Sequence, residues 1–329
     1  MKIFLIKICD CFFLLRIFLL VPVWTTIILG WITSYNNTRF GGFFFNPHAS
    51  FAEEEKMWIS LIGFSFIAAA SFVINQITDV ESDRINKKLF ILPNGLISIR
   101  TAWICAFLCA IIGLIISLVY FDILMFVLFF IGLILGVMYS LPPFNLKNTA
   151  IGGITADFIG HGMITYLVGW YAAKHGNTLD FSILVQGIIA SCTLGFAHTA
   201  VFLTTTIVDT KGDKSTGKNT FCVIFGEKKT AVTAAVSCGL ALIFSFFLEY
   251  NKLLMILQSA VSLILFASFA VRTEPEYAFK TFRWPVFLLT ALVAFFIPLY
   301  GIITLVNFFI CRIYYKLRFN YTYPTFLKK

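Results

Sequence analysis

The sequence has few charged residues. Asp, Glu, Lys and Arg together make up 12% of its 329 residues, whereas 59% of the residues are hydrophobic. Soluble globular proteins carry about 25% charged residues, so the composition excludes an ordinary soluble protein and predicts an integral membrane protein. No low-complexity linker or polar segment of domain size interrupts the chain, so residues 1–329 are expected to form one integral-membrane domain.

Two further patterns are missing. The eight cysteines lie mostly inside apolar runs, and neither a C-x-x-C pair nor a His/Cys cluster with zinc spacing occurs, so the cysteines are predicted to be packing residues. The basic and apolar N-terminus lacks a signal-peptide cleavage site close behind its apolar run, which Arg16 interrupts. The N-terminus is therefore predicted to be a retained membrane helix.

Long apolar runs, in contrast, are abundant. A membrane-spanning helix needs roughly 20 largely apolar residues. Runs of that kind occur at residues 11–34, 57–78, 100–120, 122–141, 150–173, 182–208, 230–249, 252–271 and 284–310. The sequence thus predicts an all-α polytopic protein of about nine spans. Eight or ten spans remain as alternatives, because few polar residues separate the runs at Asp122 and at Asn251.

The distribution of basic residues predicts the orientation. With a cytoplasmic N-terminus, the cytoplasmic segments of the nine-span arrangement hold fifteen Lys and Arg residues, and the opposite loops hold four. This bias favours a site that opens toward the cytoplasm from the inner or cytoplasmic membrane. The basic tail "CRIYYKLRFNYTYPTFLKK" conflicts with it, because nine spans place that tail outside. The charge is dispersed over short loops, which argues against a nucleic-acid partner.

Two similar motifs each end a long apolar run. They are "NQITDVESD" at 75–83 and "TTIVDTKGD" at 205–213, and each places two aspartates four residues apart: Asp79 with Asp83, and Asp209 with Asp213. Residues at this spacing lie about 40° apart around a helix and about 6 Å apart along it, so each pair shares a face. Four predicted spans separate the motifs, and an even number returns the chain to the same side of the membrane.

Carboxylates next to hydrocarbon are costly unless something compensates their charge. A divalent cation is the simplest compensation for four converging carboxylates, and oxygen ligands without His or Cys favour a hard ion such as Mg²⁺. The loops that follow carry Lys and Arg, which predicts a pyrophosphate site where metal and cations take up the charge of a leaving phosphate. Solvated loop charges at helix ends would explain one motif alone, but two matched motifs on one side favour a shared site.

The motifs resemble those of the UbiA-type intramembrane prenyltransferases. The family's first signature, N-x-x-x-D-x-x-x-D followed by R-I-N-K-P and a Pro-x-Gly turn, corresponds to "NQITDVESDRINKKLFILPNGLIS". The second, D-x-x-G-D-x-x-x-G-K-x-T, corresponds to "DTKGDKSTGKNT", and "YSLPPFNLK" at 139–147 lies between them as in the family. One departure is Phe90, which stands where the family often has Arg before the Pro-x-Gly turn; Lys87 or Lys88 would substitute for that cation.

The resemblance implies a nine-helix bundle around a central cavity that opens laterally to lipid. Two Mg²⁺ ions would bridge the aspartates to the diphosphate of a polyprenyl donor, and an acceptor would capture the allylic cation that ionisation produces. Carried over by position, metal binding falls to Asp79, Asp83, Asp209 and Asp213. Contacts with the diphosphate fall to Asn75, Arg84, Lys87, Lys147 and Lys218.

Two places inside the apolar runs could meet the acceptor. His198 precedes Asp209 by eleven residues, about 20° away around a helix and about 16 Å deeper, so it could orient an acceptor or take its proton. A histidine bonded to a neighbouring backbone carbonyl is the equally weighted alternative. Asp157 and His161, at i and i+4, are expected to pair with each other, more as a structural contact than as a catalytic dyad.

The sequence leaves several functions open. An aromatic or lipoquinone-type acceptor is favoured as the family's commonest use, with a tetrapyrrole, a glycerol phosphate or another lipid as alternatives. A CDP-alcohol phosphotransferase also uses Asp and Mg²⁺, but its Asp-Gly…Ala-Arg pattern is absent. A transporter is the non-enzyme alternative, although transporters prefer charges near the midplane on broken helices, whereas these aspartates lie at helix ends.

Overall fold

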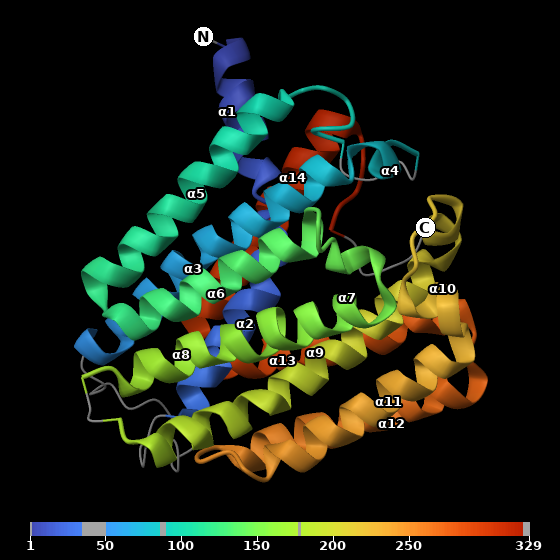
Figure 1. The fold of residues 1–329 in the computed structure, drawn as a ribbon. Coiled ribbons are helices and arrows are strands. Elements are labelled where there is room, and N and C mark those ends of the chain that lie inside the picture. Colours follow the sequence, from blue (N-terminus) through green and yellow to red (C-terminus); the bar gives the residue numbers. More distant parts are fainter. Residues whose placement is uncertain (1, 35–50, 86–89, 177–178, 325–329) are drawn as a thin grey trace.

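The computed structural model describes residues 2–34, 51–85, 90–176 and 179–324, and in these ranges the protein is helical, without strands (Figure 1). The all-α prediction is therefore confirmed. The elements in chain order are α1 (Lys2–Leu14), η1 (Ile17–Leu19), α2 (Leu20–Ser34), α3 (Phe51–Thr78), α4 (Val80–Ile85), α5 (Ile99–Tyr120), α6 (Ile123–Ser140), η3 (Leu146–Asn148), α7 (Ala150–Ala156), η4 (Asp157–Ile164), α8 (Thr165–Lys174), α9 (Phe181–Ser215), α10 (Phe221–Phe225), α11 (Glu227–Ser245), α12 (Lys252–Arg272), α13 (Pro275–Phe296) and α14 (Pro298–Phe319).

Nine helices among the described residues are long and apolar enough to cross a membrane. Their outer surfaces are apolar, as lipid contact requires: Phe107 and Val119 on α5 and Ile264 on α12 are each 66% exposed. The two helices lie at the outer edges of the bundle (Figure 1). The protein is thus an integral membrane protein.

The nine helices differ in two places from the nine predicted runs. The predicted span 150–173 is the continuous helix α7–η4–α8, which a π-helical turn interrupts, and it is not among the nine. It nevertheless runs antiparallel to α3 over its whole length, because Lys147 contacts Asn75 near the end of α3 and Lys56 near the start of α3 donates to the carbonyl of His175, at 2.9 Å each.

The predicted span 284–310 is in fact two helices. α13 ends at Phe296 and α14 begins at Pro298, whose ring has no N–H to continue the preceding helix. The described chain therefore crosses the bundle ten times, counting the interrupted helix. An even number of crossings returns the basic tail to the side of the N-terminus, and Arg318 Nη2 lies 3.1 Å from Asp10 Oδ2 of α1. This removes the conflict that nine spans created.

Small residues let key helices approach closely. A Cβ on Gly169 of α8 would lie 1.7 Å from the carbonyl oxygen of Ile27 in α2, and a Cβ on Gly162 of η4 would lie 2.3 Å from the Cα of Gly195 in α9. Close backbone contact of this kind is typical of helix packing in membranes. The second contact fixes η4 against α9, and it brings His161 beside His198.

Candidate active site

Both aspartate motifs lie at the same end of the bundle. Asp79 connects α3 to α4, with its amide 3.0 Å from the carbonyl of Asn75, and the amide of Asp83 lies 2.8 Å from the carbonyl of Asp79. Helical spacing therefore continues through the junction, and it keeps the three side chains on one face. Asp209 and Asp213 lie on the last turns of α9.

Lys147 lies at the centre of the first motif. Its Nζ is 2.9 Å from Asn75 Oδ1, 2.7 Å from Thr78 Oγ1 and 2.9 Å from Asp79 Oδ1. Only 8% of Lys147 is exposed. Burial lowers the pKa of its ammonium, Lys218 lowers it further, and Asp79 opposes both effects. Lys147 is thus a poorly hydrated cation, which three oxygen atoms of the first motif hold in place.

Lys218 joins the second motif to the first. Its Nζ lies 3.4 Å from Asp79 Oδ1. The turn that carries it is compact: the amide of Lys218 donates to the carbonyl of Asp213 at 3.0 Å, and the left-handed backbone of Gly217 (φ 72°) is one that few other residues adopt. Thr220 Oγ1 also lies 3.3 Å from Asp213 Oδ2. The two motifs, distant in sequence, therefore form one polar cluster.

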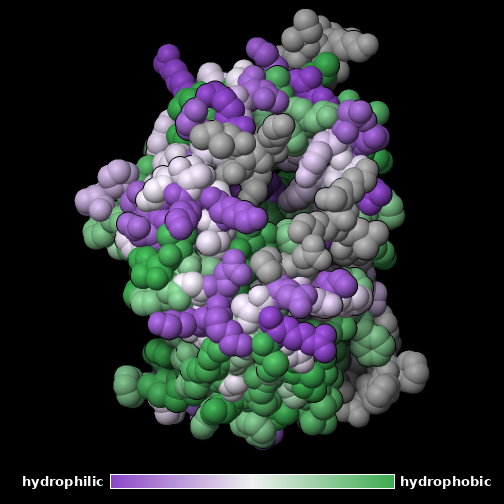
Figure 2. Space-filling view, turned by 90° about the vertical axis from the view of Figure 1, so that its right-hand side faces the viewer, coloured by the Kyte–Doolittle hydropathy of each residue, from purple (hydrophilic) through white to green (hydrophobic). Residues whose placement is uncertain are grey.

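Hydrophilic side chains are exposed at this end of the molecule. In Figure 2, hydrophilic side chains gather over the upper and middle parts of this face, and apolar side chains occupy the lower part. The first-motif carboxylates are mostly shielded from solvent: Asp83 is 9% exposed, and the side chain of Asp79 is 17% exposed. The cluster thus lies at the boundary between a polar end and the membrane-embedded helices.

The donor set fits a hard divalent cation in its chemistry. It consists of carboxylate and amide oxygens, which Mg²⁺ prefers. Among the described residues, no three His, Cys, Asp or Glu side chains converge at metal-binding spacing, and lysines balance the charge of Asp79. A cation bound at Asp79 would therefore take over the place of an ammonium, and that ammonium would be free to meet a phosphate oxygen.

One predicted phosphate contact, Arg84, has its partners outside this cluster. Arg84 pairs with Glu81 at 2.7 Å and donates to the carbonyl of Pro93 at 3.3 Å, with 57% of its side chain exposed. Lys87 and its neighbour Lys88 lie outside the described residues.

The departure at Phe90 also has a structural counterpart. Its ring lies 5.2 Å from the rings of Phe319 at the end of α14 and of Tyr321 beyond it. Where the family often has a cation, this chain thus has an aromatic contact with its C-terminal helix.

Within the described part of the chain, His198 bonds a side chain and not the backbone carbonyl of the alternative expected from the sequence. Its Nε2 lies 2.9 Å from Thr26 Oγ1 of α2. Its ring is also nearly parallel to that of His161, with an interplanar angle of 14° and 6.3 Å between the centroids. The side-chain partner Thr26 could not be found from the sequence, because α2 and α9 are far apart in the chain.

The expected pairing of Asp157 with His161 is wrong. Both residues lie in the π-helical η4, where His161 stacks between Phe72 and His198. Asp157 Oδ2 is buried and has no hydrogen-bond partner among the described residues. The spacing i, i+4 could not show that aromatic neighbours on other helices hold the imidazole ring.

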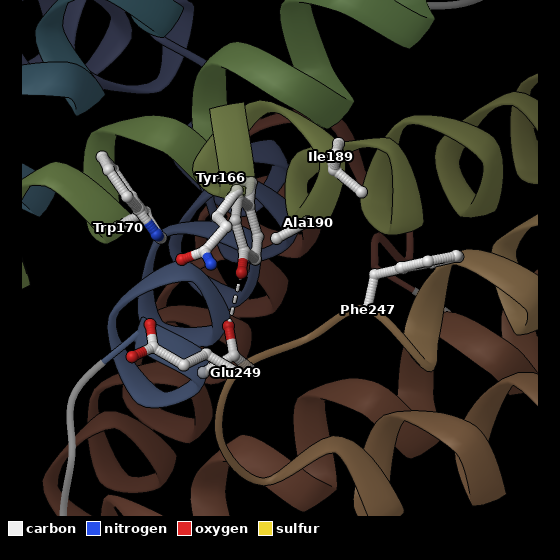
Figure 3. A pocket seen from close by; sticks show the side chains of 8 residues that line it. Tyr166, Trp170, Ile189, Ala190, Phe247 and Glu249 are labelled. Atoms are coloured by element: carbon white, nitrogen blue, oxygen red, sulfur yellow. Dashed lines mark hydrogen bonds between the residues drawn. The ribbon is translucent and has the colours of Figure 1, made fainter. Parts of the chain in front are cut away.

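A cavity of about 220 Å³ lies at the opposite end of the bundle (Figure 3). Tyr166, which donates to or accepts from Thr33 at 2.7 Å, lines it together with Trp170 and Glu249. The carboxylate of Glu249 is already paired with Lys174 at 3.0 Å. This cavity contains none of the aspartates, so it is separate from the polar cluster.

Comparison with known proteins identifies the family. A model described as the UbiA prenyltransferase family matches residues 38–290. The chain belongs to the UbiA prenyltransferase family. It is a membrane-embedded prenyltransferase, which excludes the transporter and the CDP-alcohol phosphotransferase as alternatives. Helix α14, from Pro298 onward, lies beyond the residues that the family model matches.

The similar proteins differ in what they act on. The chain is 27% identical over 242 residues to a digeranylgeranylglyceryl phosphate synthase of Sulfolobus acidocaldarius, covering 68% of this chain and 78% of that protein. It is 27% identical over 158 residues to a probable homogentisate phytyltransferase 2 of Oryza sativa subsp. japonica, covering 48% of this chain and 42% of that protein.

Among solved structures, a UbiA homolog from Archaeoglobus fulgidus bound to DMAPP and Mg²⁺ superimposes with a TM-score of 0.65. The sequences are 17% identical, and the match covers 90% of this chain and 98% of that chain. At this identity the similarity supports the fold alone.

Proposed function

We propose that this UbiA-family chain transfers a prenyl group from a polyprenyl diphosphate to an aromatic, lipoquinone-type acceptor within the membrane, and that the reaction depends on Mg²⁺. The observation that carries the proposal is the contact of Lys218 with Asp79, because it joins the two aspartate motifs into one site. Residues 1–329 would act as one integral-membrane domain.

Different residues of the cluster would bind the metal and the diphosphate of the donor. Asp79, Asp83, Asp209 and Asp213 would hold Mg²⁺, whose charge would offset the charge that develops on the diphosphate as the bond from C1 to oxygen breaks. Lys147 and Lys218 would bind phosphate oxygens, since each ammonium is already placed against Asp79. Asn75 would align Lys147, whose Nζ it contacts.

The loop after the first motif would add weaker contacts. Arg84 would have to leave Glu81 and the Pro93 carbonyl to reach a phosphate, and Lys87 would contribute from the same loop.

His198 would serve the acceptor. It lies about 16 Å below Asp209 along α9, and its bond to Thr26 orients the imidazole ring. The bond from C1 to oxygen breaks with its electron pair going to the diphosphate, the acceptor supplies the pair for the new bond to C1, and the acceptor loses one proton.

The site is proposed to face the cytoplasm from the inner or cytoplasmic membrane. Ten crossings would put the basic tail on the same side as the lysines of both motifs, and this supports the orientation that the bias of positive charge favours.

Prenyl transfer to a glycerol phosphate lipid is the second candidate, since the archaeal relative named for such a product spans most of the chain. A tetrapyrrole or another lipid acceptor is also compatible with the family.

Mass spectrometry of proteoliposomes tests the proposal. They would receive Mg²⁺, labelled prenyl diphosphates of several lengths and a panel of phenolic, quinone-precursor and glycerol phosphate acceptors. A prenylated aromatic product is expected. Release of diphosphate with coupling only to the glycerol phosphate lipid would replace the aromatic acceptor by the second candidate, and absence of diphosphate release with every donor would contradict the proposal.

A further inference from the structure

Asp157 has a buried carboxylate oxygen that the proposed reaction does not yet use. Its Oδ2 has no hydrogen-bond partner in the described part of the chain, and no cation there pairs with it. A buried polar atom without a partner costs free energy, and most such atoms in native proteins have a partner. A partner that arrives with a ligand would remove this cost.

Asp157 lies in the part of its helix that begins beside the donor site, because α7 starts three residues after Lys147. Along its own helix, Asp157 lies seven residues after the start of α7, or about 10 Å from the polar end of the bundle. It is presented by a π-helical turn, a distortion that is frequent at functional sites.

A stack of three rings lies four residues further along the helix and deeper in the bundle. The rings of Phe72 and His161 lie 5.9 Å apart at 19°, and those of His161 and His198 lie 6.3 Å apart at 14°. Aromatic rings prefer offset stacking on such neighbours. His161 and His198 are only partly buried, so part of the stack is accessible.

We propose that Asp157 accepts the proton of an uncharged phenolic or enolic acceptor, which lies beside the ring stack of Phe72, His161 and His198. This inference rests on the proposed prenyl transfer. The hydroxyl would donate to Asp157 and so supply its missing partner. A phosphate or carboxylate on the acceptor would be repelled by Asp157, so the class of acceptor is an uncharged ring that carries an acidic hydroxyl.

The step balances. The bond from C1 to oxygen of the donor breaks and its electron pair leaves with the diphosphate. A ring carbon next to the hydroxyl supplies the pair for the new carbon–carbon bond, while the hydroxyl proton passes to Asp157 and the ring becomes a dienone. Tautomerisation moves the ring proton to oxygen, and Asp157 releases one proton overall.

The test compares Asp157→Asn with the parent in proteoliposomes, using geranylgeranyl diphosphate and an acylphloroglucinol as probes. Asn keeps the size of Asp but cannot take a proton. The ratio of free prenyl alcohol to coupled product should rise about a hundredfold, in line with the usual contribution of a general base, while diphosphate release stays near the parent rate. Asp157→Glu should restore part of the coupling, and the control Asp122→Asn, at the opposite end of the bundle, should leave the ratio at its value in the parent.

The outcomes separate the inference from the proposed function. An unchanged ratio in Asp157→Asn, or a parallel loss of diphosphate release and coupling, overturns the role of Asp157. If the parent protein couples the donor to a prenylated glycerol phosphate faster than to the acylphloroglucinol, the proposed class of acceptor is wrong. Absence of diphosphate release in the parent itself would instead refute the proposed function.

Discussion

The ammonium of Lys218 lies 3.4 Å from Oδ1 of Asp79, although 139 positions separate the two residues in the sequence. Asp79 belongs to the first aspartate motif and Lys218 to the second. Lys147 reaches the same oxygen at 2.9 Å from the loop between them. Three segments thus converge on one carboxylate.

Lys147 is expected to be essential for the use of the donor. Lys147→Met removes a buried cation that Asn75, Thr78 and Asp79 hold, and it should lower kcat/KM for the prenyl diphosphate about a hundredfold, as loss of one preorganised donor does. Steady-state diphosphate release would measure the change. The matched control is Lys211→Met, at an exposed position of α9; an equal effect in both variants would show that overall positive charge, not the position of Lys147, matters.

The Asp10–Arg318 pair is expected to stabilise the protein. Asp10 is 1% exposed, and it accepts hydrogen bonds from Tyr314 at 2.7 Å and from Arg318. Arg318→Ala leaves this carboxylate without its cation and should cost about 3 kcal/mol, seen as a lower unfolding temperature in detergent. Asp10→Asn combined with Arg318→Gln should cost less than Arg318→Ala alone. A larger loss in the double variant would show that the ion pair is not the source of the stability.

The ten crossings predict the sidedness of three positions. In a background without native cysteines, Ser98→Cys, Ser215→Cys and Tyr321→Cys should react with an impermeant maleimide from the same side of sealed vesicles. Ser182→Cys, at the start of α9, should react only from the other side. Labelling of Tyr321→Cys together with Ser182→Cys would contradict the tenth crossing.

Asp122 is expected to stabilise the opposite end in a pH-dependent way. Burial alone would raise the pKa of its carboxyl, but hydrogen bonds from Tyr171 and from the amides of Met125 and Leu124 lower it overall. A lowered pKa means that the stabilisation is present above the unfolded pKa of about 3.9 and is lost as the pH falls through the folded value. Asp122→Ala removes an N-cap of α6 and should cost about 1 kcal/mol at neutral pH.

The measurement is thermal unfolding in detergent as a function of pH. The difference between the parent and Asp122→Ala should shrink below about pH 4. Because 42% of the side chain is exposed, solvent screening limits the contribution of charge. A difference that grows on acidification would contradict this account.

The features of the candidate site that could be predicted from the sequence depend on the spacing of residues along one helix and on whether the number of crossings is even or odd. The spacing of Asn75, Asp79 and Asp83 places them on one face, and the side of Lys218 follows from an even number of crossings. The family resemblance assigned Lys147 to the diphosphate site, and in the structure Lys147 contacts Asp79 of the first motif.

Features that depend on packing between distant segments could not be predicted. The break at Ile297 and Pro298 lies within the apolar stretch "FFIPLYG", where hydropathy shows no boundary. The stack of His161 on Phe72 and the bond of His198 to Thr26 each join two helices, and spacing along one helix contains no information about them. Arg84 is held by Glu81 and by a backbone carbonyl, which a residue-by-residue comparison with a family motif cannot show.

The central claim is that both aspartate motifs form one diphosphate site. Metal-dependent cleavage of the donor tests this claim most directly. Diphosphate release from geranylgeranyl diphosphate would be measured for the parent, Asp79→Ala, Asp209→Ala and the control Asp122→Ala, each at an equal amount of folded protein, in Mg²⁺ and in EDTA. The account predicts release by the parent and the control in Mg²⁺, none in EDTA, and none by the two motif variants. Release at the parent rate in EDTA, or by either motif variant, would contradict it.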